Sequence, residues 1–245
     1  MATYFISDLH LTEDRPDITA GLYALLQQIA DDASKLYIIG DLFEYWVGDD
    51  CKTPLTIEVA RKLKGLADKG ISIFYIHGNR DFMIGKKFAA EAGMQLLKEH
   101  TIIDLYGKNV LILHGDTLCI DDEAYQNYRN KVRQPFRQKL FSLLPRFIRQ
   151  KVADKIRSSS RQAKKGKNLQ IMDVNPGEVE RFFTEFKVDT MIHGHTHRPK
   201  VHQLQVNNMN CRRIVLGDWD KNISYVRARA EDLELMTLPL AEDNR

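Results

Sequence analysis

The chain has 245 residues, of which 43% are apolar and 28% charged, and it carries a formal net charge of +3. This composition predicts a soluble globular protein of one large domain or two small ones, because it supplies enough apolar material for a full core. No run approaches the roughly 18 to 20 apolar residues that cross a bilayer, and no signal-peptide pattern is present. The three cysteines lack CxxC spacing, which disfavours a disulfide framework. A cytosolic protein is therefore expected.

Short apolar runs alternate with helical patterns over the first half of the chain. In chain order we predict a strand over 3–7, a helix over 16–30, a strand over 36–40, a helix over 54–67, a strand over 71–76, a helix over 82–92 and a strand over 109–115. Such alternation indicates an α/β domain whose strands are buried on both faces.

The segment from about Asp122 to Asn168 has a different character, being helical in pattern, basic, and interrupted by Pro145, which can begin a second helix at its first turn. Between positions 129 and 167 there are fourteen Lys or Arg against one acid, a net +13, so the rest of the chain carries −10. This asymmetry suggests an anionic partner such as nucleic acid, a lipid head group or a phosphorylated substrate. We predict an inserted helical lobe, 122–168, within a main domain formed by 1–121 and 169–245.

Apolar residues recur in this lobe largely at three- and four-residue spacing. They are Phe136, Leu140, Leu143, Leu144, Phe147, Ile148, Val152 and Ile156. Amphipathic helices of this kind lie at anionic membrane surfaces or cover acyl chains, and the alternative is that the stripe packs the lobe onto the body. Beyond the lobe, five strand-like runs from 190 to 238 predict a mostly β C-terminal portion.

Polar residues of a few chemical types come directly after the predicted strands. They are Asp8, His10, Asp41, Asn79, His114, His195 and His197. Strand ends converge at one edge of an α/β sheet, so these residues can meet although they are far apart in sequence. Each motif alone has a structural explanation, but packing does not explain the set. Carboxylate, imidazole and amide ligands together fit two divalent cations, with Asp41 as a candidate bridge between them.

The order Asp-x-His, Gly-Asp, Gly-Asn-x-Asp, His and Gly-His-x-His, from Asp8 to His197, resembles the calcineurin-like metallophosphoesterase superfamily. More narrowly, SDLHL, GDLFEYWVGDD, HGNRDFMIG, HGDTLCIDDEAYQNYR and HGHTHRP are similar to the UDP-2,3-diacylglucosamine pyrophosphohydrolase family of Gram-negative lipid A biosynthesis. The resemblance implies an αββα sandwich and a dinuclear manganese site. It also implies cleavage of UDP-2,3-diacylglucosamine to 2,3-diacylglucosamine 1-phosphate (lipid X) and UMP, by a peripheral protein on the cytoplasmic face of the inner membrane.

Roles for individual residues follow from the same resemblance. One metal is assigned Asp8, His10, Asp41 and His197, and the other Asp41, Asn79, His114 and His195. Substrate contacts are assigned to Asn79, Arg80, Asp122, Ser160, Lys164, Lys167 and His195, and catalysis to Asp41, Asn79, Arg80 and His195. The ligand types themselves permit Mn, Fe, Zn, Co or Mg.

One residue departs from the superfamily pattern. Many two-metal phosphoesterases carry Gly-Asn-His-Asp, whose histidine protonates the leaving group, whereas this chain has Arg80 in IHGNRDF. A sugar 1-phosphate, with a second pKa of about 6, is a weak base that can leave a pyrophosphate without a proton. The permanent charge and planar fork of arginine suit phosphate oxygens. The other interpretations are a decayed centre, which the complete ligand set opposes, and a surface or salt-bridging role for Arg80, for example with Asp81.

Two rival functions compete with hydrolysis of a diacylated UDP-sugar. A metallonuclease would contact phosphates through the basic lobe, but it leaves Arg80 and the apolar stripe unexplained. A non-catalytic binding scaffold is opposed by the complete ligand set. The sequence therefore favours the pyrophosphohydrolase, with no nucleic acid and no obligate protein partner expected.

Overall fold

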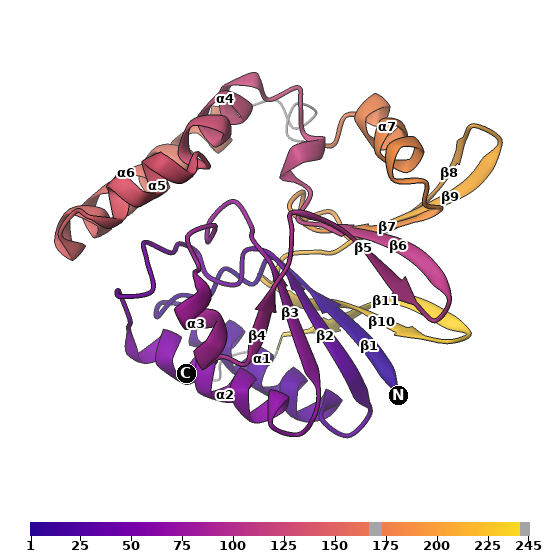
Figure 1. The fold of residues 1–245 in the computed structure, drawn as a ribbon, viewed down its shortest axis with the longest axis horizontal. Coiled ribbons are helices and arrows are strands. Elements are labelled where there is room, and N and C mark those ends of the chain that lie inside the picture. Colours follow the sequence, from indigo (N-terminus) through magenta and orange to yellow (C-terminus); the bar gives the residue numbers. More distant parts are fainter. Residues whose placement is uncertain (167–172, 241–245) are drawn as a thin grey trace.

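The computed structural model describes the backbone of residues 1–166 and 173–240 and the side chains of residues 1–156 and 173–240. Two β-sheets face each other (Figure 1). The first, in the order β11-β10-β1-β2-β3-β4, contains β1 (Ala2–Ile6), β2 (Ala33–Ile39), β3 (Ser72–Ile76), β4 (Met94–Leu96), β10 (Asn222–Arg229) and β11 (Asp232–Pro239). The second, in the order β5-β6-β7-β9-β8, contains β5 (His100–Leu105), β6 (Lys108–Leu113), β7 (Thr190–His193), β8 (Lys200–Val206) and β9 (Met209–Val215).

Helices cover the outer face of each sheet and complete four layers (Figure 1). On the first sheet lie α1 (Pro16–Ile29), α2 (Pro54–Ala67) and α3 (Lys86–Glu91), and on the second lies α7 (Pro176–Phe186). Three buried apolar clusters fill the spaces between successive layers, and the middle one joins Phe5 and Tyr37 of the first sheet to Ile112 and Ile214 of the second. The predicted αββα sandwich is confirmed.

Several elements differ from the predictions. The strands β4 and β5, the helix α7 and the short 3-10 helix η1 (Asp116–Leu118) were not predicted. The predicted helix over 82–92 is shorter, because the Asp49 carboxylate accepts hydrogen bonds from the backbone N–H groups of Gly85, Lys87 and Phe88 and so places the start of α3 at Lys86. The predicted mostly β C-terminal portion is confirmed by β7 to β11, and it is divided between the two sheets, since β10 pairs with β1, with Val226 opposite Phe5.

The described part of the predicted lobe, up to residue 166, contains three helices rather than two, and they stand beyond the ends of the strands of the two sheets (Figure 1). These are α4 (Glu123–Val132), α5 (Pro135–Ser142) and α6 (Arg146–Gly166). Pro145 directly precedes the third of them, while Pro135 begins the second. Among the described residues, no helix is both long enough and apolar enough to cross a membrane.

Candidate metal centre

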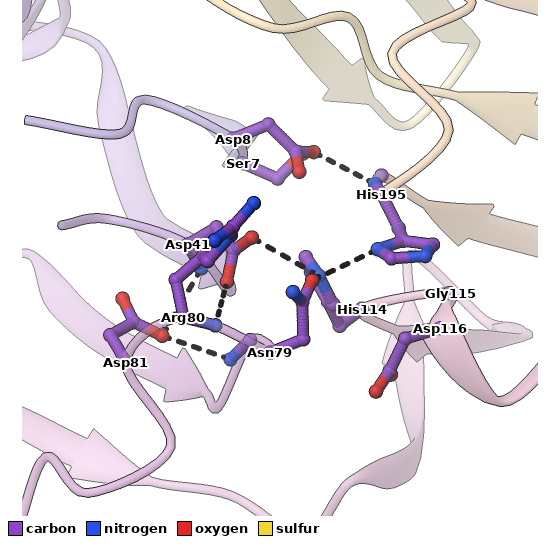
Figure 2. Close-up of polar contacts among 12 residues, drawn as sticks. Ser7, Asp8, Asp41, Asn79, Arg80, Asp81, His114, Gly115, Asp116 and His195 are labelled. Atoms are coloured by element: carbon purple, nitrogen blue, oxygen red, sulfur yellow. Dashed lines mark hydrogen bonds and ion pairs between the residues drawn. The ribbon is translucent and has the colours of Figure 1, made fainter. Parts of the chain in front are cut away.

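The predicted ligands lie together where the strands of the two sheets end. Figure 2 shows five of them, Asp8, Asp41, Asn79, His114 and His195. Asp8 and His10 follow β1, Asp41 follows β2, Asn79 follows β3, His114 follows β6, and His195 and His197 follow β7. Asp8, Asp41 and His114 are almost completely buried, with at most 1% of each residue exposed. The two carboxylates and one imidazole of the centre therefore lie within the core, whereas the side chains of His10 and His197 are 18% and 26% exposed.

One group of ligand atoms gathers around Asp8, and we call it position A. The Nε2 atoms of His10 and His197 lie 3.3 Å apart, and both face Oδ1 of Asp8, at 4.0 and 3.4 Å. This Oδ1 is buried and has no hydrogen-bond partner among the described residues. A buried carboxylate oxygen without a donor is costly unless a cation compensates it, so these three side chains fit a divalent metal.

A second group, position B, gathers around Asn79. Its Oδ1 lies 3.0 Å from Nε2 of His114 and 3.0 Å from Nδ1 of His195. Asp41 stands between the two positions, because its Oδ2 is 3.8 Å from Nε2 of His10 and 3.6 Å from Nε2 of His114. Its other oxygen accepts the backbone N–H of Arg80 at 2.8 Å. This arrangement fits the predicted bridging role.

The backbone at the ligands is strained. The φ angles of Asp8, His10, Asp41, His195 and His197 are 56°, 51°, 53°, 69° and 56°. Residues other than glycine rarely adopt this left-handed region, although Asp and His tolerate it better than most, and such conformations persist where the surroundings over-determine them. The strand-end loops thus hold these side chains at the centre at a cost in backbone energy.

Two motif glycines are required by close packing against the metal-ligand carboxylates. A Cβ atom on Gly78 would collide with Asp41, and one on Gly194 would collide with Asp8 and Ser7. These contacts explain why glycine directly precedes the ligands Asn79 and His195 in the sequence.

Comparisons with known proteins agree with this geometry. A family model described as calcineurin-like phosphoesterase matches residues 1–199. A UDP-2,3-diacylglucosamine hydrolase of Serratia proteamaculans (strain 568) is 51% identical over 239 residues, covering 98% of this chain and 100% of the relative. One of Enterobacter sp. (strain 638) is 50% identical over the same shares of the two chains.

The chain belongs to the UDP-2,3-diacylglucosamine hydrolase family of calcineurin-like phosphoesterases.

In the metal-free hydrolase, burial and neighbouring charges set the protonation of the carboxylates and imidazoles of the centre. Burial opposes the charge on Asp8, but the imidazoles of His197, His114 and His10 close to it lower its pKa below the usual range. Burial also opposes the charge on His197, but the carboxylates of Asp218 and Asp8 beside its two ring nitrogens raise its pKa to about 10. Burial and the charge of His114 lower the pKa of His195 to about 3. Metal binding at position A therefore has to displace a proton from His197, whereas the imidazole of His195 is already neutral.

Arg80 is half-buried beside Asn79, and among the described residues its guanidinium makes no hydrogen bond or ion pair with the protein. The alternative that it pairs with Asp81 is wrong. The Asp81 carboxylate is fully buried and accepts four backbone N–H groups, those of Gly78, Asp41, Leu42 and Phe43, at 2.7 to 3.3 Å. Asp81 thus holds two ligand loops together and leaves the guanidinium of Arg80 available for a substrate.

We expect Asp81→Asn to destabilise the fold by about 1–3 kcal/mol, because a carboxamide cannot accept on both sides and leaves buried N–H groups unpaired. Urea denaturation of the metal-free protein measures this. Asp31→Asn, at an exposed carboxylate, is the control and should change stability little. Equal stability of both variants and the parent would refute the proposed function of Asp81.

An ion-pair network around the buried Asp116, which no pattern in the sequence indicated, attaches α4 to the metal centre. Asp116 accepts hydrogen bonds from Tyr125 at 2.7 Å and from Nε of Arg129 at 2.8 Å. Arg133 donates to the carbonyl of Gly78 at 2.8 Å, and the ring of Tyr125 lies 6.0 Å from that of His195. The first helix of the lobe is therefore fixed against the loops that carry Asn79 and His195.

A second attachment joins α6 to the loop that follows Asp41. Arg149 is only 2% exposed, and its Nη1 donates to the carbonyl of Val47 at 2.6 Å and to Asp50 at 2.8 Å. Gln150 donates to the hydroxyl of Tyr45 at 2.7 Å. Together the two attachments hold the lobe next to the metal centre.

The predicted substrate contacts have different outcomes. Asn79, Arg80 and His195 lie at the centre. Asp122 caps the start of α4, where it accepts the backbone N–H of Tyr125 at 3.0 Å. The side chains of Ser160 and Lys164, on α6, and the whole of Lys167 lie outside the described residues. The roles of all these residues as substrate contacts stay predictions.

Two carboxylates next to the ligands were missed, Glu44 and Asp218. The Asp218 position carries a usable signal, because IVLGD at the end of β9 repeats the strand-Gly-Asp pattern of Asp41. Nδ1 of His10 lies 3.1 Å from Glu44, and Nδ1 of His197 lies 3.2 Å from Asp218.

Proposed function

We propose that this protein hydrolyses the pyrophosphate bond of UDP-2,3-diacylglucosamine by attack of water on the α-phosphorus, giving 2,3-diacylglucosamine 1-phosphate and UMP, a step of lipid A biosynthesis. The observation that carries this is the identity of about half of all residues, over 98% of the chain, to relatives named for hydrolysis of that substrate. The clustering of the complete ligand set supports it.

We propose that the centre holds two divalent cations, with Mn²⁺ as the resident metal. Position A takes Asp8, His10, Asp41 and His197, and position B takes Asp41, Asn79, His114 and His195. When bound, such cations supply a water of lowered pKa and neutralise charge on phosphoryl oxygens. The protein's contribution is to hold the ligands on strained, tightly bonded loops, so that little reorganisation is needed during the reaction.

Arg80 is the residue that suits this centre to a pyrophosphate. Its backbone N–H is fixed on Asp41, which directs the side chain from the rim of the centre, and its guanidinium has no carboxylate partner among the described residues. A planar, permanently charged fork neutralises pyrophosphate oxygens. Because the departing sugar phosphate is a weak base, no acid is required at this position.

The lobe provides a surface for the diacylated part of the substrate and for the membrane that contains it. Its outermost apolar side chains, Phe136, Leu143 and Phe147, are 75%, 74% and 64% exposed, so packing onto the body does not account for them. They lie among the basic residues that give this segment its charge of +13. An apolar and basic helical surface of this kind associates with anionic lipid, and we propose peripheral attachment to the inner membrane.

Leu144 and Phe147 test the role of the lobe. We expect the Leu144→Ser/Phe147→Ser variant to lower kcat/KM for long-chain substrates far more than for short-chain ones. Each buried methylene that loses its apolar contact costs about 0.8 kcal/mol of binding free energy. The measurement is the ratio of kcat/KM between long- and short-chain substrates. Ile57→Ser/Ile102→Ser changes exposed apolar residues outside the lobe and serves as the control. A ratio equal to that of the parent, in a folded variant, would contradict acyl binding by these two residues.

Product analysis tests the reaction itself. The purified protein is incubated with Mn²⁺ in ¹⁸O-labelled water with the diacylated UDP-glucosamine, and in parallel with single-stranded DNA and a cyclic nucleotide. We expect turnover of the UDP-sugar, with the label in UMP. Label in the lipid product would place the attack on the other phosphorus, and comparable turnover of DNA would favour the nuclease.

A further inference from the structure

The histidines of the two metal positions are supported by groups of different charge. At position A, Nδ1 of His10 lies 3.1 Å from a Glu44 oxygen, and Nδ1 of His197 lies 3.2 Å from an Asp218 oxygen. At position B, Nδ1 of His114 lies 3.0 Å from the carbonyl oxygen of Ile39, a neutral backbone group. The two metal positions therefore differ in the residues behind their ligands as well as in the ligands themselves.

Each carboxylate lies within 3.2 Å of Nδ1 of the ring in front of it, and its negative charge attracts a proton to that atom. A proton on Nδ1 that is donated to a carboxylate leaves the lone pair on Nε2, and it makes that nitrogen a stronger base. The Nε2 atoms of His10 and His197 are the atoms that face Asp8 and each other. When a cation displaces the proton on Nε2, Glu44 and Asp218 thus keep the other proton on Nδ1 and leave both Nε2 lone pairs directed at position A.

The charges around the two positions also favour tighter cation binding at position A than at position B. Position A has Asp8 as its own anionic ligand, shares Asp41, and has Glu44 and Asp218 directly behind it. Position B shares Asp41, and its remaining ligands, from Asn79, His114 and His195, are neutral in the metal-binding form. The buried acid close to it, Asp116, is already paired with Arg129 at 2.8 Å and lies 3.7 Å from Arg133.

We propose that Glu44 and Asp218 are positioning residues that make position A the tighter of the two metal positions, so that the first cation binds there and position B exchanges its cation more readily. This inference rests on the two-metal centre proposed above. It assigns a function to two side chains that do not touch the metal.

The test is a titration of the metal-free protein with Mn²⁺, followed by calorimetry and by electron paramagnetic resonance of the free ion. For the parent we expect two equivalents in two separated steps. Glu44→Gln and Asp218→Asn should each weaken the first step about 10- to 100-fold and leave the second nearly unchanged. Asn79→Ala should do the reverse, removing the second step and preserving the first.

Controls separate positioning from a general effect on the fold. Glu58→Gln changes an exposed glutamate whose side chain is 49% accessible, and it should leave both steps unchanged. Thermal unfolding of each metal-free variant measures stability without the metal. A variant that keeps its melting temperature but loses first-step affinity supports positioning.

The outcomes distinguish this inference from the proposed function. Two steps of equal affinity in the parent, or variants that leave both steps unchanged or weaken both equally, would overturn the assignment of Glu44 and Asp218 while keeping the two-metal hydrolase. A parent that binds a single equivalent would overturn the two-metal centre.

Discussion

Asp41→Asn is expected to lower kcat/KM for the UDP-sugar by about three orders of magnitude, a loss comparable to that of one preorganised charge-stabilising group. In the parent, the backbone N–H of Arg80 donates to Oδ1 of Asp41 at 2.8 Å, and the asparagine oxygen can still accept this bond. An uncharged NH₂ group replaces Oδ2. That Oδ2 lies between His10 and His114, so the change removes the charge shared by both metal positions.

The fold should survive this substitution, because asparagine tolerates the φ of 53° at position 41 nearly as well as aspartate. Metal titration of the variant should show fewer than two equivalents, and circular dichroism should match the parent. Asp31→Asn is the control at an exposed carboxylate. Near-normal turnover with both metals retained would disprove the bridging role.

The second large effect is expected at Arg80. Arg80→His should lower kcat/KM for the UDP-sugar about 10- to 100-fold, because a hydrogen bond to a charged group contributes about 1.5–3 kcal/mol and imidazole lacks both the permanent charge and the bidentate fork. The loss should shrink as the pH is lowered below about 6.5, where the imidazole gains a proton. Steady-state kinetics across this pH range measure both effects.

Arg61→His is the matched control, since the Arg61 side chain is 69% exposed and pairs only with Glu58 at 3.5 Å in the described part of the chain. The control should retain full activity at every pH. If Arg80→His matched the parent on the UDP-sugar, the explanation of the missing superfamily histidine by the leaving group would fail. Improved hydrolysis of phosphate esters with basic leaving groups by Arg80→His would support it further.

The ligands could be predicted because their signal is local. Each lies one to four residues after an apolar strand, and parallel strands bring their carboxyl ends to one edge, so Asp8, Asp41 and Asn79 had to approach one another. The basic helical segment could be predicted equally well, because its charge and the spacing of its apolar residues differ from those of the rest of the chain. Arg80 was visible as a single departure from a motif.

The supporting residues could not be assigned in this way, because their functions depend on contacts between distant segments. Glu44 and Asp218 matter through the nitrogen atoms that they face, and Asp116 through helix α4, which packs against it after an intervening turn. Asp81 looked like a possible partner of its neighbour Arg80, yet it accepts backbone N–H groups from a loop forty residues away.

The sequence by itself thus determined the strand-end ligands, the layered α/β class and the basic helical segment, since each follows from short-range periodicity and composition. Only the tertiary structure decided which sheet the last two strands join, because strand pairing depends on long-range register, as between β1 and β10. Only the tertiary structure placed the lobe beside the metal centre, through the half-buried Arg133 and the buried Arg149, because an arginine shielded from water pairs with whichever acceptors the fold brings to it.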